Sequence, residues 1–411
     1  MFRITRYAAT ACLLAAAVAM PSSQPTAAAA AVPPVHHVFV IVLENASFKQ
    51  SYGPDSRYPA LSITARDQGT LLDQYYAVAH YSAGNYQAIL AGVAPGSDTQ
   101  NDCPRYRDMT GAARAAFGQV KASSGCIYPS WVPTLASQLT AKQLSWKGYM
   151  EDMANQGARE QSTCGQPALG PHNEDLTQKA VNGDAYAARH NPFVYFRSVT
   201  SIPACAANVV PLTDLPQDLA TIGHTPNFSF ITPNLCDDGH DSTCNGKPSD
   251  PSAENSWLQT WIPRITSSPA FRADGALFIT SDEADNDSGA CCQEPSGPNT
   301  AYPGYPKSAG TDVSFTGSQG SGKGGGRIGT LVISPFVRPG GTSSTPYNHY
   351  SLLRSIEDLF GLTHLGYAGQ PGLQGFGTDL WSVGAGISAP PGPCAAADRP
   401  APATPCRPPE R

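Results

Sequence analysis

Two pairs of polar residues follow apolar runs, at positions where they could hold a divalent cation. Glu44 and Asn45 come directly after the run VFVIVL, and Asp282 and Glu283 come shortly after the run ALFIT. Adjacent carboxylates repel each other unless they share a cation or a proton. Carboxylate and amide oxygens are ligands that hard divalent cations prefer. Each pair by itself is equally compatible with a polar surface turn.

Ser82 precedes a short helical pattern, within the segment 80–86 (HYSAGNY). A serine in this position can serve simply as the N-cap of the helix. The same position also suits a nucleophile, because the N–H groups and the positive dipole end of a helix N-terminus favour a phosphoryl oxygen. A nearby metal ion would lower the pKa of the hydroxyl and activate it. The sequence is compatible with both functions.

Two further histidines lie where they could bind metal, contact a phosphate or donate a proton. His240 lies among acidic residues and directly before Asp241, whereas His349 precedes a helical pattern. A lone histidine is more often structural, so neither residue identifies a site by itself. Six other histidines are interpreted as structural: His36, His37, His172, His190, His224 and His364.

Four apolar runs rich in β-branched residues are predicted to form strands. Runs without alternating polar residues are typical of strands buried on both faces, as in a parallel sheet. Helical patterns lie between and after them, and this alternation predicts an α/β sandwich. Because ligands bind beyond the carboxyl ends of strands in such sheets, we expect the two acidic pairs at one sheet edge. The predicted strands are 38–43, 228–232, 276–280 and 330–334, and the predicted helices are 85–90, 132–139, 257–266 and 351–360.

The N-terminal segment 1–31 has the features of a secretory signal. Arg3 and Arg6 precede an apolar run over 7–20, and a tract of small residues follows it. That run is too short to span a bilayer, and no later apolar run approaches the roughly 20 residues required. We therefore expect an exported protein without a transmembrane anchor, with a catalytic domain over 32–387 and a Pro/Ala-rich tail over 388–411.

Ten of the 11 cysteines lie outside the predicted signal segment. An even number in an exported chain indicates up to five disulfides, whose pairing the sequence does not determine. We expect Cys394 and Cys406 to form a local link in the tail, and the adjacent Cys291 and Cys292 to bond to different partners. The segment 95–225 holds four cysteines and is predicted to be a loop-rich, disulfide-bonded insertion over the sheet edge.

Charge and composition exclude several classes of partner. The formal net charge is −6, and charged residues make up 14% of the chain against the usual ~25%. A nucleic-acid-binding protein would need a basic face, so we expect no nucleic-acid partner. The sequence also lacks a polybasic segment that would attach it to an anionic membrane. It leaves the oligomeric state open.

Several blocks occur in an order that resembles a known family. The chain resembles the bacterial phosphoesterase family that contains secreted acid phosphatases and phospholipases C, within the alkaline-phosphatase-like superfamily. The resemblance implies a three-layer αβα sandwich with a mostly parallel central sheet. The matching blocks are 38–45, 80–86, 278–283 and 330–361, together with a looser match over 233–241.

The resemblance also implies roles for the residues above. Ser82 would attack phosphorus and become a phosphoserine, and it would lie beside a metal ion. Histidines would contact the phosphate or assist the leaving group, and the ion would be Mg²⁺, Ca²⁺ or Mn²⁺, or Zn²⁺ if histidines ligate it. The implied metal ligands are Glu44, Asn45, Ser82, Asp282 and Glu283; the implied catalytic and orienting residues are Ser82, His240, His349, His80 and Asn85; and the implied substrate-binding residues are Asn85, His240, Asp241 and His349.

The expected function is that of a secreted, metal-dependent phosphomonoesterase of the acid phosphatase type. A phospholipase C that cleaves phosphodiesters is a close alternative, although such enzymes of this family are usually longer. A phosphoinositide phosphatase is an intermediate alternative, with monoester chemistry on a phospholipid head group. A fourth alternative, from another class, is a secreted binding protein that uses the same scaffold without catalysis.

Overall fold

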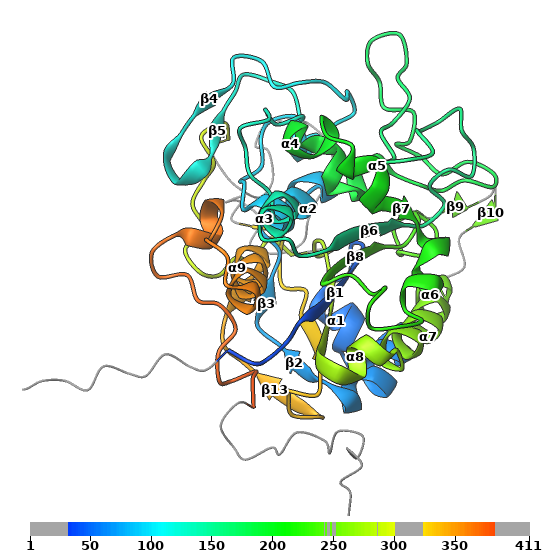
Figure 1. The fold of residues 1–411 in the computed structure, drawn as a ribbon, viewed down its shortest axis with the longest axis vertical. Coiled ribbons are helices and arrows are strands. Elements are labelled where there is room, and N and C mark those ends of the chain that lie inside the picture. The colour runs from blue at the N-terminus through cyan, green and yellow to red at the C-terminus, as the bar shows by residue number, and fades with distance from the viewer. Residues whose placement is uncertain are drawn as a thin grey trace, which may run out of the picture. The chain divides into compact units, whose positions relative to one another are not determined.

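An eight-stranded sheet forms the centre of the fold (Figure 1). The computed structural model describes residues 32–382 except 242, 245–246, 249–251, 286 and 301–323. The strand order is β13-β2-β12-β11-β1-β8-β6-β7. Their bounds are β1 (His37–Leu43), β2 (Thr70–Leu72), β6 (Trp146–Met150), β7 (Val209–Pro211), β8 (Phe228–Thr232), β11 (Gly275–Ser281), β12 (Thr330–Ile333) and β13 (Gly341–Ser343).

Strand β1 lies between β11 and β8 and runs parallel to both. All seven of its side chains are buried, as the continuous apolar run predicted. Strands β6 and β7 continue the parallel arrangement. In contrast, β12 pairs antiparallel with β11 and with β2, so its apolar run does not belong to the parallel part. A strand in the interior of a sheet is buried whether it runs parallel or antiparallel to its neighbours, so its composition does not reveal its orientation.

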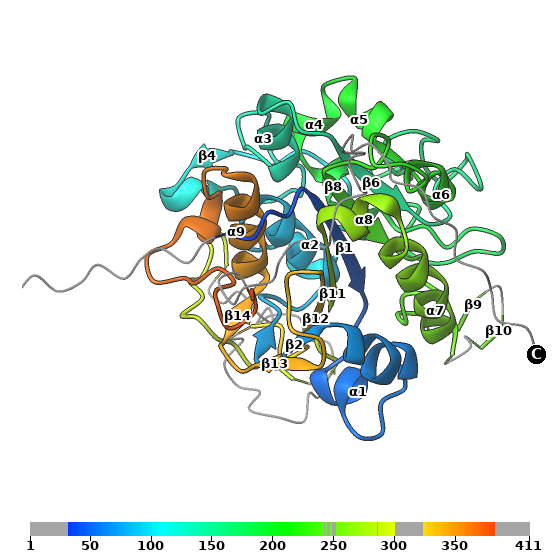
Figure 2. The same cartoon turned by 60° about the horizontal axis from the view of Figure 1, so that its bottom comes forward.

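Helices cover both faces of the sheet, which confirms the predicted αβα sandwich (Figures 1 and 2). Alternate residues of β1 face opposite layers: Val40 packs into the core with the helices of one face, and Ile41 packs into the core on the other. The first face carries α2 (Ser82–Ala91), α3 (Leu135–Ala141) and α9 (His349–Phe360), and the second carries α7 (Ala253–Thr266) and α8 (Pro269–Asp274).

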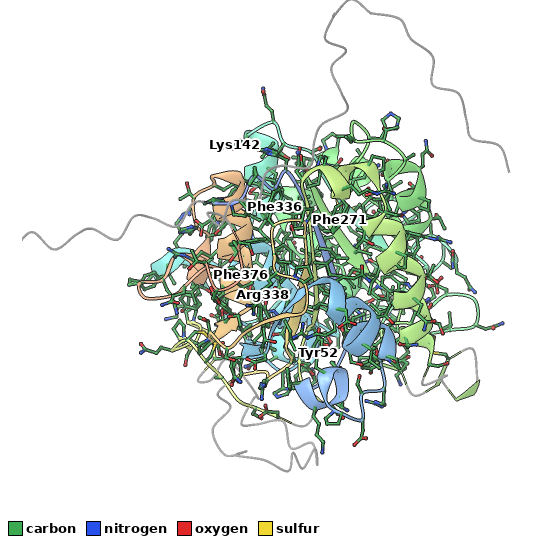
Figure 3. The ribbon with its side chains drawn as sticks, turned by 90° about the horizontal axis from the view of Figure 1, so that it is seen from below. Tyr52, Lys142, Phe271, Phe336, Arg338 and Phe376 are labelled. Atoms are coloured by element: carbon green, nitrogen blue, oxygen red, sulfur yellow. A yellow bond between two sulfur atoms is a disulfide. The ribbon has the colours of Figure 1, made fainter. Side chains whose placement is uncertain are left out.

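Aromatic side chains pack into both cores, and Phe271 and Phe376, one from each core, are labelled in Figure 3. Phe271 of α8 lies with its ring centroid 6.3 Å from that of Phe39 of β1. On the other face, the ring centroid of Phe376 lies 5.8 Å from that of Phe278 of β11. Helix α8 begins where Ser268 accepts a hydrogen bond from the backbone of Phe271, and a proline occupies its first position. These caps hold Phe271 against the sheet.

Shorter elements connect the layers. Within the described residues, no helix is long and apolar enough to cross a membrane. The short helices are α1 (Phe48–Tyr52), α4 (Arg197–Thr200), α5 (Ala204–Asn208) and α6 (Leu215–Asp218). Single turns include η1 (Ala60–Ala65), η2 (Arg66–Gln68), η3 (Thr99–Asn101), η4 (Ala116–Gly118), η5 (Ala188–His190), η6 (Pro192–Tyr195), η7 (Leu212–Asp214) and η8 (Gly366–Gly369). Three two-stranded ladders pair β3 (Tyr75–Tyr76) with β14 (Tyr347–Asn348), β4 (Ala113–Arg114) with β5 (Val120–Lys121), and β9 (Thr243–Cys244) with β10 (Lys247–Pro248).

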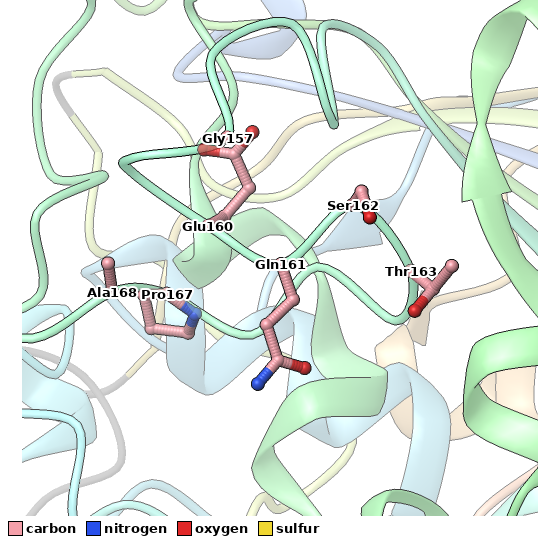
Figure 4. A pocket seen from close by; sticks show the side chains of 7 residues that line it. All are labelled: Gly157, Glu160, Gln161, Ser162, Thr163, Pro167 and Ala168. Atoms are coloured by element: carbon pink, nitrogen blue, oxygen red, sulfur yellow. The ribbon is translucent and has the colours of Figure 1, made fainter.

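The segment 95–225 is loop-rich and carries two disulfides, Cys103–Cys126 and Cys164–Cys205. It is more than a cap over the sheet, however, because it supplies β6 and β7 to one side of the central sheet. A cavity of about 590 Å³ also lies in this segment (Figure 4). None of the predicted site residues lines it; the lining residues are Gly157, Glu160, Gln161, Ser162, Thr163, Pro167 and Ala168.

One expectation about the cysteines was wrong. Cys291 and Cys292 form a disulfide with each other rather than with different partners. The backbone is left-handed at Cys292, where φ is 65°, and the two adjacent sulfur atoms meet there. A further disulfide links Cys236 and Cys244. Cys394 and Cys406, like the predicted signal segment and tail, lie outside the described residues.

Helix α9 carries a buried acid outside the predicted site. Glu357 is fully buried; its Oε1 accepts a hydrogen bond from the backbone of Leu365 at 2.8 Å, and its Oε2 has no hydrogen-bond donor. Burial raises the pKa of Glu357 from 4.5 to about 9. The folded protein therefore keeps a proton there that the unfolded chain releases over this pH range.

We expect Glu357→Gln to flatten the dependence of stability on pH. The pKa of Glu357 is higher in the folded protein than in the unfolded chain. The contribution of this group to stability is therefore fully present below pH 4.5 and is lost as pH rises toward about 9. One proton corresponds to at most about 1.4 kcal/mol of unfolding free energy per pH unit. Urea unfolding of the wild type and of Glu357→Gln at several pH values measures how the free energy of unfolding depends on pH in each. Asp55→Asn, which changes an exposed acid, is the control. Parallel curves for wild type and Glu357→Gln would contradict this assignment.

Candidate active site

The ends of β1 and β11 place the two predicted acidic pairs side by side. Leu43 and Ser281, the last residues of these strands, are in register. The backbone N–H of Asp282 donates to Leu43 O at 2.9 Å, and that of Asn45 donates to Asp282 Oδ1 at 3.2 Å. Asn45 has φ of 41°, a conformation that asparagine tolerates better than most residues. This turn ends β1 and keeps Glu44 and Asn45 at the sheet edge.

Ser82 is the first residue of α2, and Tyr81 occupies the cap position. The Ser82 hydroxyl is therefore not the cap; it donates to Oε2 of Glu44 at 2.8 Å. Tyr81 has φ of 70° and ψ of 123°, a conformation that costs a bulky residue on the order of 1–3 kcal/mol. Such strain concentrates at functional sites. The strained turn places the hydroxyl beside the acidic pairs.

The side chain of Glu44 contacts residues from two elements, α2 and η5. Its Oε2 accepts from Ser82, and its Oε1 accepts from the Tyr86 hydroxyl at 2.9 Å. The same Oε1 lies 3.2 Å from Nε2 of His190, whose Nδ1 lies 3.2 Å from Oδ2 of Asp238. Tyr86 also stacks on His190, with ring centroids 5.2 Å apart. Glu44 thus has one oxygen toward Ser82 and the other toward His190.

Arg189 brings a buried positive charge to the site. Its side chain is only 3% exposed, and its Nη1 donates to the backbone of Gln178 at 2.9 Å. Its Nη2 lies 3.4 Å from Nε2 of His240, and its Nε lies 3.9 Å from Oδ2 of Asp102. Asp102 Oδ1 in turn accepts from the backbone of Ala83 at the start of α2. The guanidinium therefore lies near the N-terminus that carries Ser82.

His240 and Asp241 lie on the loop that follows β8. Nδ1 of His240 lies 2.7 Å from Asp241 Oδ1. Because a guanidinium can only donate, Nε2 of His240 accepts from Arg189, and Nδ1 carries the proton toward Asp241. The loop bends at Gly239 with φ of 92°, where an added Cβ would lie 2.6 Å from Glu254 Oε2. The His240 side chain is 26% exposed and is the most accessible histidine of the site.

His349 is enclosed. Its Nε2 donates to the carbonyl oxygen of Asp282 at 2.7 Å, and its Nδ1 accepts from the Tyr75 hydroxyl at 3.1 Å. Burial lowers the pKa of His349 to about 4, so the ring is neutral above that pH. The geometry favours a positioning role for His349 over the substrate contact or proton donation implied by the resemblance.

His80 and Asn85 also use their polar atoms within the scaffold. Asn85 Oδ1 accepts from the backbones of Val78 and Ala79, and its Nδ2 donates to Ala79 O. His80 Nε2 donates to Asp287 O at 2.9 Å, while its Nδ1 lies 3.6 Å from Glu283 Oε1. Asn85 therefore fixes the turn before Ser82, and His80 lies behind Glu283. Neither geometry favours direct substrate binding.

Four carboxylates are concentrated at this edge. Burial is the main cause that raises the pKa of each well above its usual value, and neighbouring acids raise it further; the four are Glu44, Asp238, Asp282 and Glu283. Three buried oxygens on these loops lack a hydrogen-bond donor: Asn45 Oδ1, Asp282 Oδ2 and Glu283 Oε2. Buried acceptors without partners are costly, and a bound cation would satisfy them. The donor set therefore fits a divalent cation.

A second group of ligating atoms lies next to this set. Within the part of the chain that the structure describes, Glu44, His190 and Asp238 have donor atoms that all lie within 4.8 Å of one another. Asp282 and Glu283 are not members of this group, although they lie at the same sheet edge. This group thus differs from the metal ligands that the resemblance implied, and Glu44 is common to both sets.

Sequence reasoning did not assign Arg189, His190 or Asp238 to the site. His190 was interpreted as structural, yet it lies between two buried carboxylates. A signal was present: Arg189 and His190 are the charged or titratable residues of an otherwise apolar stretch, AYAARHNPFVY. A basic pair in such a stretch must be buried together with acids that compensate it.

Comparison with known proteins gives a family match over most of the chain. The model of the family described as "Phosphoesterase family" matches residues 55–363. The match includes Ser82, Arg189, His190 and Asp282 and begins after Glu44. A phosphate-repressible acid phosphatase of Penicillium chrysogenum is 28% identical over 327 residues, which cover 79% of this chain and 59% of that protein. The chain thus spans a little over half of that relative's length.

Two other proteins are similar over most of the chain. A phosphatidylinositol-3-phosphatase of Mycobacterium tuberculosis is 25% identical over 346 residues, which cover 84% of this chain and 82% of that protein. A crystal structure of an alkaline phosphatase superfamily protein from Vibrio parahaemolyticus aligns with a TM-score of 0.44 and 12% identity, over 82% of this chain and 69% of that one. Because the family model matches well over half of the chain, this protein belongs to the Phosphoesterase family.

Proposed function

We propose that this protein is a secreted, metal-dependent phosphomonoesterase of the acid phosphatase type. The contact of the Ser82 hydroxyl with Oε2 of Glu44 at 2.8 Å, at the start of α2, carries the proposal. The hydrogen bond orients the hydroxyl for attack, and the helix N-terminus favours phosphoryl oxygens. The disulfides Cys103–Cys126 and Cys164–Cys205 support an oxidising compartment.

In the proposed reaction, Ser82 Oγ bonds to phosphorus while the bond from phosphorus to the leaving oxygen breaks. The serine proton leaves to solvent water as this bond forms, and the hydrogen bond from Ser82 to Glu44 orients the hydroxyl beforehand. His240, once protonated at Nε2, gives that proton to the leaving alcohol. Water then attacks the phosphoserine and returns a proton to His240, and Ser82 recovers its proton as inorganic phosphate leaves.

The charges around Ser82 support phosphoryl transfer. Arg189 would attract the phosphate dianion, because its guanidinium is buried beside the N-terminus of α2. Glu44, Asn45, Asp282 and Glu283 would hold the divalent cation, which when bound supplies charge neutralisation at the phosphate. His349 and His80 would keep Asp282 and Glu283 in place.

A second candidate is a phosphoinositide phosphatase. The chain covers 82% of the length of the phosphatidylinositol-3-phosphatase relative, against 59% of the acid phosphatase relative. A substrate of this kind is still a phosphate monoester, so the reaction at Ser82 is unchanged. The two candidates differ only in the group that carries the phosphate.

Hydrolysis assays on several esters test the proposal. We expect turnover of p-nitrophenyl phosphate that EDTA abolishes and that Mg²⁺, Ca²⁺, Mn²⁺ or Zn²⁺ restores, measured from about pH 4 to about pH 9. Faster release of phosphate from short-chain phosphatidylinositol 3-phosphate would favour the second candidate. Preferential cleavage of p-nitrophenylphosphorylcholine would indicate a phospholipase C instead. No turnover of any ester by the metal-loaded protein would favour a binding protein.

A further inference from the structure

His190 occupies an unusual position between two buried carboxylates. Nε2 lies 3.2 Å from Glu44 Oε1, and Nδ1 lies 3.2 Å from Asp238 Oδ2. The side chain is only 2% exposed, yet neither ring nitrogen makes a hydrogen bond of acceptable geometry, and Asp238 Oδ2 also lacks a donor. Unpartnered polar atoms at this depth are costly unless a ligand satisfies them.

We propose that Glu44, His190 and Asp238 bind a second divalent cation, separate from the one expected beside Ser82. Their donor atoms all lie within 4.8 Å of one another. An imidazole nitrogen with two carboxylate oxygens suits Zn²⁺ or Mn²⁺ better than Mg²⁺ or Ca²⁺. Each of the three residues comes from a different segment, and the fold alone brings them together.

Glu44 is the residue that both sites share. Its Oε2 accepts a hydrogen bond from Ser82, whereas its Oε1 faces His190. A carboxylate can give one oxygen to each of two cations, as in two-metal hydrolytic sites. The second cation would therefore lie across Glu44 from the nucleophile, within the same acidic cluster.

Counting bound metal tests the proposal without reference to turnover. The full chain is stripped with chelator, dialysed against Mn²⁺ or against Zn²⁺, and its metal content is measured per chain. We expect about two equivalents in the wild type and about one in His190→Gln and in Asp238→Asn. His224→Gln, which changes an exposed histidine, should retain two. In isothermal titration, the second binding step should weaken at least about 100-fold in both site variants.

The two variants remove different ligands, and the wild-type count requires no variant at all. One equivalent in the wild type would overturn the proposal and would favour a proton shared between His190 and a neighbouring carboxylate instead of a cation. Two equivalents retained in His190→Gln would also overturn it. Two equivalents in a protein that hydrolyses no phosphate ester would uphold the second site while refuting the proposed function.

Discussion

Ser82→Ala is expected to lower turnover of p-nitrophenyl phosphate by at least about 10³-fold, with little change in KM. The change removes the attacking oxygen but leaves the charges around it, so binding of the phosphate should persist. Stopped reactions with ³²P-labelled substrate should show a phosphorylated wild-type protein and an unlabelled variant. This experiment separates a covalent reaction from direct attack by water.

A matched control is available in α1. Ser51 is buried, and its hydroxyl has no hydrogen-bond partner, so Ser51→Ala removes a comparable group away from Glu44. It should keep wild-type turnover and labelling. If Ser82→Ala kept more than about a tenth of the wild-type turnover, or still became labelled, Ser82 could not be the nucleophile.

Asp282→Asn is expected to abolish most turnover and, at the same time, to stabilise the metal-free protein. Asn45 and Glu283 donate their backbone N–H groups to Oδ1 of Asp282, and an amide oxygen can accept both bonds. The substitution therefore removes a negative charge with little loss of hydrogen bonding. We expect turnover to fall about 10²–10³-fold, because the cation and the phosphate are held less well.

The gain in stability follows from the raised pKa. Burial and then Glu283 raise the pKa of Asp282, so the wild-type protein without metal loses stability as pH rises through that pKa. The amide that replaces this carboxyl group does not ionise, and in EDTA at pH 7.5 the variant should be more stable by about 1–2 kcal/mol, with a smaller difference at pH 5. Urea unfolding at both pH values measures this.

Glu357→Gln serves as the control, because it also removes a buried acid but lies outside the site. It should change stability without changing turnover. If Asp282→Asn kept wild-type turnover, Asp282 would not be part of the active site. A metal-free Asp282→Asn protein less stable than wild type at pH 7.5 would show that the acidic cluster is not under the electrostatic repulsion described above.

Local patterns in the sequence determined the main elements of the fold. The four apolar runs became β1, β8, β11 and β12, because burial on both faces requires uninterrupted apolar residues. The helical patterns became α2, α3, α7 and α9. The spacing of apolar residues on one face explains α9, whereas α2 is buried on all sides. The location of Glu44 and Asp282 at strand ends followed directly, since the residue after a parallel strand lies at the sheet edge.

Only the tertiary structure decided which side chains meet at that edge. His190 and Arg189 lie far from Glu44 along the chain, and their contacts with Glu44, Asp238 and His240 depend on how the segment 95–225 packs against α2. The sequence showed that these residues were polar in an apolar stretch, but not which acids they would face. Hydrogen-bond partners of this kind are set by long-range packing, which no local periodicity encodes.

The same reason accounts for the altered roles of His349 and Asn85. Their blocks identified them as site residues, and both lie beside the site; however, all of their polar side-chain atoms bond to the scaffold. Residue type and spacing determined the chemistry available at this sheet edge, namely a serine, acids and histidines. Packing decided which of those groups remain without partners, and thereby which of them are able to bind a cation or a phosphate.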